Sequence, residues 1–242
     1  KTFTSTAAKV NGETINGAGS VDVTALNATA GADLSNITVS GTRTATISGN
    51  VTFTGDLGTF TTTIESGNTL TTTRAKATGE IIAGEGTLSI SDDGSLLDCT
   101  NITASIVSFA AGATDFTGTL VNGRSYTIPG GQTFTSAAAE VTTMTISGAG
   151  TVAVTALDAT AAADLSNITA TTVTAAVSED VTFTGTIGSA VVTVANTKTF
   201  TSTAAKVTGE TINGSGTVAI TALDATAAAD LSNITATTVT AA

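Results

Sequence analysis

The sequence has no histidine and no tryptophan, and it has one residue each of cysteine, proline, methionine and tyrosine. Without histidine, the usual catalytic triads cannot be built. A single cysteine excludes an internal disulfide framework, so the chain is not stabilised by covalent crosslinks. We therefore expect a protein that depends on packing and backbone hydrogen bonds, and we expect no enzyme activity.

Basic residues are also scarce: 8 lysines and arginines stand against 19 aspartates and glutamates, for a net charge of −11. This balance argues against a nucleic-acid partner, because phosphates attract clusters of Lys and Arg. No apolar run approaches the roughly 18 residues that a membrane-spanning helix needs, so we expect no membrane insertion. An acidic surface suits solubility at high salt or loose binding of divalent cations.

Threonine is the dominant residue, with 57 copies in 242 residues, and the hydrophobic fraction is 41%. Alanine, glycine and serine supply much of the rest. Thr, Val and Ile favour extended backbone because their branched Cβ atoms fit a pleated surface. The composition predicts strands almost throughout, around a thin core of small and β-branched side chains.

Long repeats organise the chain. Residues 1–38 match residues 198–235 nearly letter for letter, "QTFTSAAAEV" begins a further copy at 132, and a divergent copy begins near Asn68. We predict one continuous array over residues 1–242 with repeats of about 65 residues at 1–67, 68–131, 132–197 and 198–242, the last one partial. Both ends interrupt a repeated motif, so we expect a fragment of a longer chain.

Each long repeat consists of short segments in which apolar residues and threonines alternate, which is typical of strands. Segments such as "SGAG" between them supply turns. Separate β-sandwich domains would need a denser core than one to three aromatics per repeat can give. We therefore predict an all-β parallel β-solenoid with about three coils per long repeat. Phe3, Leu70, Phe134 and Phe200 share one repeat position, as do Phe53, Phe116 and Phe183, and we expect side chains to stack on their own kind along the axis.

The segment "ADLSNIT" at 32–38 recurs at 163–169 and 229–235, and "LDCTNIT" at 97–103 resembles it. One interpretation is a divalent-cation site, since carboxylate oxygens are ligands of Ca²⁺. Its candidate metal ligands are Asp33, Asp164, Asp230, Asp158 and Asp224. However, Asn27 replaces the aspartate of 158 and 224 in the first copy, so a charge is not required there.

The second interpretation, which we favour, is a structural turn that every repeat needs. Asn and Asp side chains bond to nearby backbone in such turns, while the leucine and isoleucine face the core. Cys99 aligns with leucine and is expected to act as a small buried hydrophobic residue. The predicted structural residues are Leu34, Asn36, Ile37, Cys99, Asn101, Ile102, Leu165, Asn167, Ile168, Leu231, Asn233 and Ile234.

With "LDATA…DLSNIT" set among strands rich in Thr, Ala, Gly and Ser, the chain resembles repetitive bacterial surface proteins. These are the β-solenoid parts of surface-layer (S-layer) proteins and of large secreted adhesins. The resemblance implies an extracellular location on the bacterial cell surface and self-association into a filament or lattice. It also implies a possible cell-surface glycan partner and, in some members, bound Ca²⁺. The calcium-binding solenoid motif GGxGxD is absent, and we expect no required cofactor.

We therefore predict a structural extracellular segment. One alternative is an ice- or glycan-binding solenoid that uses exposed T-x-T segments, although these segments come at uneven intervals along the sequence. A second alternative is a carbohydrate-active β-helix enzyme with clustered carboxylates. The acids mostly recur with the repeats, and the unrepeated Asp92 and Asp93 are expected in a turn.

Overall fold

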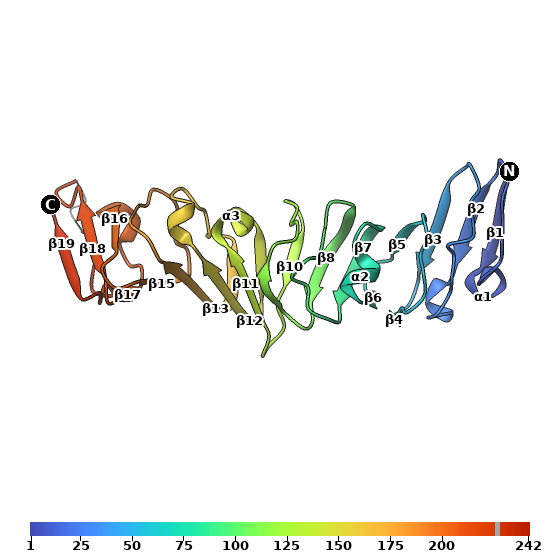
Figure 1. Cartoon of the computed structure of the whole chain (residues 1–242), viewed down its shortest axis with the longest axis horizontal. Helices are drawn as coiled ribbons and strands as arrows, with labels where there is room; N and C mark the ends of the chain where they lie inside the picture. The colour runs from blue at the N-terminus through green and yellow to red at the C-terminus, as the bar shows by residue number, and fades with distance from the viewer. Residues whose placement is uncertain (226–227) are drawn as a thin grey trace. The chain divides into compact units, whose positions relative to one another are not determined.

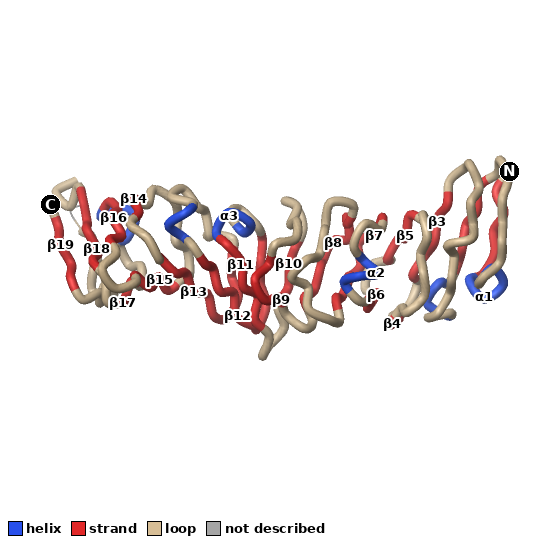
Figure 2. Tube along the Cα trace, viewed as in Figure 1, coloured by secondary structure: helices blue, strands red, loops and turns tan. Residues whose placement is uncertain are grey.

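The computed structural model describes residues 1–225 and 228–242 and is a parallel β-solenoid with about 13 turns of about 19 residues each (Figures 1 and 2). Each strand pairs in parallel with a strand about one turn away, as in the pairing of Phe3 with Val21. The all-β solenoid prediction is confirmed, and 9% of the chain is helical.

Two compact units divide the chain. Unit 1 contains Lys1–Gly112 and Gly118–Thr127, and unit 2 contains Ala113–Thr117 and Ile128–Ala242. The strands of unit 1 are β1 (Thr2–Thr6), β2 (Ser20–Thr24), β3 (Arg43–Ile47), β4 (Val51–Thr52), β5 (Thr61–Ile64), β6 (Thr69–Thr72), β7 (Ile81–Ile90), β8 (Ile102–Phe109) and β10 (Ser125–Thr127). Its short helices are α1 (Ala7–Val10), α2 (Arg74–Ala77) and the 3₁₀ turn η1 (Leu26–Ala28).

Unit 2 repeats the same types of element. Its strands are β9 (Ala113–Phe116), β11 (Thr133–Ala137), β12 (Thr145–Thr155), β13 (Ile168–Val177), β14 (Val181–Thr182), β15 (Val191–Val194), β16 (Thr199–Thr203), β17 (Ile212–Gly214), β18 (Thr217–Thr221) and β19 (Thr238–Ala241). Its helices are α3 (Ala138–Val141), α4 (Ala204–Val207) and η2 (Leu157–Ala159).

The strands stack into ladders. Each ladder is named after the residue that it contains at the repeat position shared by Phe3, Leu70, Phe134 and Phe200. In unit 1, the Phe3 ladder is β1-β2-β3-β5-β7-β8, and the Leu70 ladder is β4-β6-β7-β8-β10. In unit 2, the Phe134 ladder is β9-β11-β12-β13-β15-β17, and the Phe200 ladder is β14-β16-β18-β19.

Strand β7 belongs to two ladders because it bends. Ile81–Ala83 pairs with β5, whereas Thr87–Ile90 pairs with β6. Gly84 lies at the bend with φ of 108°, and a Cβ atom there would come within 2.2 Å of the Ile64 carbonyl oxygen. Gly148 makes the same bend in β12, so the sequence places glycine where only glycine fits.

A long repeat does not contain a whole number of turns, contrary to the expectation of about three coils. Paired strands are 17 to 22 residues apart, as shown by the pairs Thr44–Thr61 and Val21–Arg43. The Phe134 ladder passes through Val152 and Val173 to β15 and then β17. Phe200, one long repeat after Phe134, falls between those last two strands and belongs to the other ladder.

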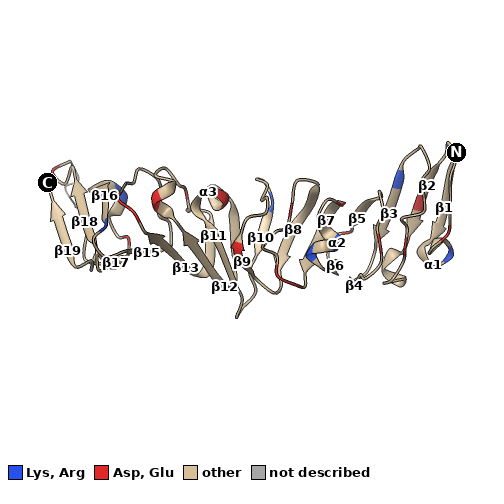
Figure 3. Cartoon of the chain, in the orientation of Figure 1, with Lys and Arg blue, Asp and Glu red and all other residues tan. Residues whose placement is uncertain are grey.

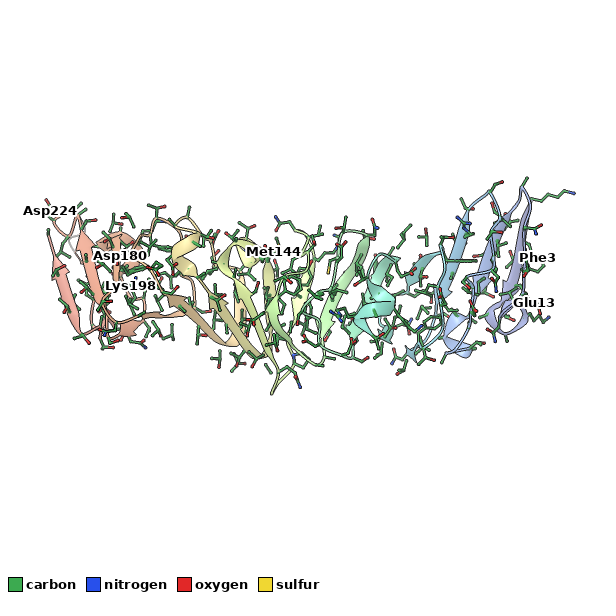
Figure 4. All side chains as sticks on the ribbon, viewed as in Figure 1. Phe3, Glu13, Met144, Asp180, Lys198 and Asp224 are labelled. Carbon is green, nitrogen blue, oxygen red and sulfur yellow. The ribbon has the colours of Figure 1, made fainter. Side chains whose placement is uncertain are left out.

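The expected stacking of side chains on their own kind occurs, and it joins the two repeat positions that carry phenylalanine. Phe134 packs on Phe116, with ring centroids 5.0 Å apart, and Phe200 packs on Phe183 at 5.5 Å. Each pair joins two different repeat positions about one turn apart. Phe3 begins its ladder at the edge of unit 1 and is 52% exposed (Figure 4).

Strands do not fill the chain as fully as the composition predicts. A one-turn α-helix follows β1, β6, β11 and β16, as seen in Figure 2. In α1, Ala7 and Val10 are buried while the residues between them are exposed. A spacing of three residues puts both on one face of a helix, so this segment turns and fills the core at the same time.

Candidate functional site at the repeated corner

The "ADLSNIT" segment is a corner, as the structural interpretation expects. In each copy, the carbonyl of the leucine position accepts a hydrogen bond from the isoleucine amide three residues later. The N···O distances are 3.1 Å for Leu34–Ile37, 3.0 Å for Cys99–Ile102, 3.0 Å for Leu165–Ile168 and 3.1 Å for Leu231–Ile234. One tight turn therefore closes the corner in every repeat.

The aspartate of the motif stabilises this turn. Asp33 Oδ1 accepts hydrogen bonds from the Ser35 amide at 3.0 Å and from the Ser35 hydroxyl at 2.6 Å. Amides two residues later donate to the equivalent acids at 2.9 Å for Asp98 and 3.0 Å for Asp164 and Asp230. These side-chain and backbone hydrogen bonds lower the pKa of all four carboxyls below the ordinary value.

Hydrogen bonds also tie the corner to the turns on both sides. The Leu34 amide donates to the Asp56 carbonyl of one neighbouring turn at 2.8 Å, and the Asp33 carbonyl accepts from the Gly12 amide of the other at 2.9 Å. The Asp33 amide donates to Asn11 Oδ1 at 2.8 Å. Thr142 and Thr208 hydroxyls take the place of Asn11 in the later copies. The polar groups of the corner are thus used inside the stack of turns.

The apolar residues of the motif point into the core. Leu34, Ile37, Cys99, Ile102, Leu165 and Ile168 are between 0% and 1% exposed. Leu231 and Ile234 are half-buried. The asparagine side chains are exposed, and the backbone carbonyls of Asn36, Asn101, Asn167 and Asn233 accept hydrogen bonds from isoleucine amides of an adjacent turn.

Cys99 is fully buried against Tyr126, and the two side chains interact by hydrogen bonding. Burial raises the pKa of the Cys99 thiol to about 12, so the thiol stays protonated at neutral pH. The Tyr126 hydroxyl in turn bonds to the Val121 amide and carbonyl at 2.7 and 3.1 Å. The tyrosine occupies space that the leucine of other copies would need, which explains why a smaller residue stands at position 99.

The other acidic candidates are apart from this turn. Asp158 Oδ1 accepts from the Ser178 amide at 2.7 Å and from its hydroxyl at 3.2 Å. Asn27 Oδ1 makes the same two contacts with Ser48, at 3.2 and 3.1 Å. An amide carbonyl can replace the carboxylate because only its acceptor oxygen is used. Asp224 is exposed.

Acidic residues do come close to one another near Asp33. Asp33 forms a β-bridge with Asp56, and Asp56, Lys76 and Glu80 line a cavity of about 150 Å³. Burial, and then repulsion from Asp56, raise the pKa of Glu80, and Lys76 partly offsets both effects. The Lys76 ammonium donates to the Gly55 carbonyl at 2.6 Å, so a cation already occupies this position.

Among residues 1–225 and 228–242, no group of three or more His, Cys, Asp or Glu side chains could hold a metal ion. The five acidic candidates are not brought together at one point. Sequence reasoning missed the Lys76–Glu80 arrangement, although the recurring "K-x-x-G-E" at 9–13, 76–80 and 206–210 is a signal that could have found it.

The architecture places the chain in the class of parallel β-solenoids. Comparison with known family models, with curated proteins and with solved structures finds no match to this chain. In the described part of the chain, no helix is long and apolar enough to cross a membrane.

Proposed function

We propose that the chain is a structural, non-enzymatic segment of an extracellular bacterial protein, of the surface-layer, filament or adhesin kind. The observation that carries this proposal is the use of the corner's polar groups. They bond to neighbouring turns in each repeat and do not converge on a cavity, as the Asp33 and Leu34 contacts illustrate. Such groups serve rigidity, since each repeat buries its faces against the next.

The mechanism is mechanical. Parallel ladders join each turn to the next through backbone hydrogen bonds, and buried pairs such as Phe183–Phe200 fill the space between turns. Among the described residues, strands β1 and β19 each pair on one side, so further β-structure of the same protein or of another copy can continue these ladders. The proposed partners are therefore other copies of the chain and, at the cell surface, glycans. The proposal requires no cofactor.

Two measurements test this function. Protease added to intact cells that produce the whole protein should remove these repeats, while a cytoplasmic marker survives. The purified chain, followed by sedimentation and electron microscopy over rising concentration, should assemble into filaments or lattices. A chain protected from external protease, or one that stays monomeric at all concentrations, would contradict the proposal.

A further inference from the structure

Two ladders of unit 2 present regular arrays of threonine on their outer faces. In the Phe200 ladder, Phe200 and Val218 point inward, and the alternate residues point outward. Registered rows of outward residues run across the strands: Thr199–Thr217–Thr238, Thr201–Ala219–Thr240 and Thr203–Thr221. Seven of these eight positions are threonine.

The Phe134 ladder repeats this pattern one long repeat earlier. Across β11, β12 and β13 its outward rows are Thr133–Thr151–Thr172 and Thr135–Ala153–Thr174, and the second row continues to Val191 of β15. The alanine of the middle strand recurs at the same place, because β12 and β18 are copies of one segment. We call these two surfaces the threonine arrays.

The uneven spacing of T-x-T segments along the sequence does not disturb the arrays. Thr133 and Thr151 are 18 residues apart, and Thr151 and Thr172 are 21 apart, yet all three lie in register. Turns of different length absorb the difference. Neighbouring strands are about 4.8 Å apart and alternate residues along a strand roughly 6.6 Å apart, so the outward side chains form a rectangular grid.

The strands of the arrays contain no charged residue, and Figure 3 shows β11, β12, β13, β18 and β19 without acidic or basic residues. Charges flank the first row of the Phe200 ladder, where Lys198 precedes Thr199 and Asp180 Oδ1 accepts a hydrogen bond from the Thr199 amide at 2.7 Å. The equivalent strands of unit 1 differ, because Asp22 stands where β18 has Ala219. Asp22 accepts a hydrogen bond from the Thr44 hydroxyl at 2.8 Å, so neither side chain can belong to a regular array of free threonine hydroxyls.

We propose that the threonine arrays bind the surface of crystalline water. Each threonine offers one hydroxyl and one methyl group, and oxygen atoms in hexagonal ice repeat at spacings similar to those of this grid. The branched Cβ restricts χ1, so little side-chain freedom is lost on binding. A neutral surface also leaves first-layer water free to take the lattice orientation, whereas a carboxylate would orient water around itself.

The test uses the full chain and seeded ice. The chain should produce thermal hysteresis and slow ice recrystallisation in a concentration-dependent manner. The double variant Ala153→Asp/Ala219→Asp copies the unit 1 charge into both arrays and should lose more than half of the hysteresis. The matched control Asp22→Ala should retain it. Circular dichroism establishes that each variant is folded.

If the aspartate variant does not fold, Thr135→Lys/Thr201→Lys places the charge on the same arrays through longer, solvent-reaching side chains. A wild-type chain without hysteresis would overturn the inference, as would full activity in a folded array variant. A third outcome, in which the array variants lose only co-sedimentation with an insoluble polysaccharide, would assign the arrays to a glycan and also overturn it.

Discussion

Units 1 and 2 consist of copies of the same long repeats. They differ from each other at outward-facing positions and at inward-facing positions. On the outer faces, unit 1 carries Asp22 and the exposed Ile81 where unit 2 carries alanine and threonine. These changes leave the ladder pairing intact. Outward positions tolerate a change of chemistry because water surrounds them.

Inward positions vary under a different rule. The second residue of β5, β10 and β15 is Thr62, Tyr126 and Val192 in turn, and all three are fully buried. Tyr126 is accompanied by Cys99 in place of leucine, so the extra volume is compensated. The Thr62 hydroxyl is buried with no hydrogen-bond partner in the described structure. The comparison shows two kinds of change at core positions. Either a second residue changes as well and compensates for the difference in volume, or a buried polar group is left without a hydrogen bond and lowers the stability of the fold.

The largest expected effect concerns Phe200 and Phe3, which are copies of one residue in units 2 and 1. Phe200→Ala should cost about 3–5 kcal/mol of unfolding free energy, because it opens a cavity beside Phe183. Phe3→Ala should cost well below about 1 kcal/mol, because Phe3 is 52% exposed. Denaturant titration followed by circular dichroism measures both. Equal losses would show that position within the ladder does not matter.

The next effect tests volume compensation at Cys99 and Tyr126. Cys99→Leu should destabilise the chain by about 1–3 kcal/mol through overpacking. Combining it with Tyr126→Val recreates the residue pair Leu165 and Val192 of unit 2. The double variant should lose less unfolding free energy than the sum of the losses in the two single variants. The difference, which is the coupling energy, should be about 0.5–3 kcal/mol. Additive losses would mean that the two positions are independent.

A smaller effect of opposite sign is expected at Thr62. Thr62→Val, which copies Val192, should stabilise the chain by about 1 kcal/mol because it removes a buried hydroxyl without a partner. Thermal unfolding measures the change. Thr63→Val, at the exposed neighbouring position, is the matched control and should have little effect. A loss of stability in Thr62→Val would indicate that the hydroxyl makes a needed contact.

The smallest effect is a pH dependence from the corner aspartates. Their folded pKa values lie below the unfolded value of about 3.9, so ionisation stabilises the folded state above that pH. This contribution disappears as the pH falls through the folded pKa values. The midpoint temperature of thermal unfolding should therefore decrease as the pH is lowered below about 4. Asparagine at all four positions should flatten this drop.

Much of the architecture was predictable from particular residues. The alternation in "TFTST" and the recurrence of "ADLSNIT" indicated strands and a fixed corner, and the model has both. Asn27 in place of aspartate indicated that position 158 needs no charge, and in the structure both side chains accept through one oxygen atom.

Other features of the structure could not be predicted from the amino-acid sequence. Ala25 and Ala156 adopt left-handed backbone, with φ of 51° and 49°, although alanine rarely does so. Each of these alanines directly precedes a 3₁₀ turn, η1 or η2, and sequence patterns do not report its conformation. Turn length is equally hidden, because 17 and 22 residues both complete a turn when loops differ. The placement of each repeat on its ladder could therefore not be derived.

The mismatch between repeat and turn has a consequence for errors during folding. Nearly identical strands, such as β11 and β16, would pair with each other as readily as with their correct neighbours if they met in adjacent turns. The fold separates them, since β11 lies between β9 and β12 while β16 lies between β14 and β18. A wrong pairing of Thr133–Ala137 with Thr217–Thr221, which is a near copy of its correct partner β12, would have to skip the turns that lie between them. Duplication can thus lengthen the gene by whole repeats without placing two copies where each could be mistaken for the other.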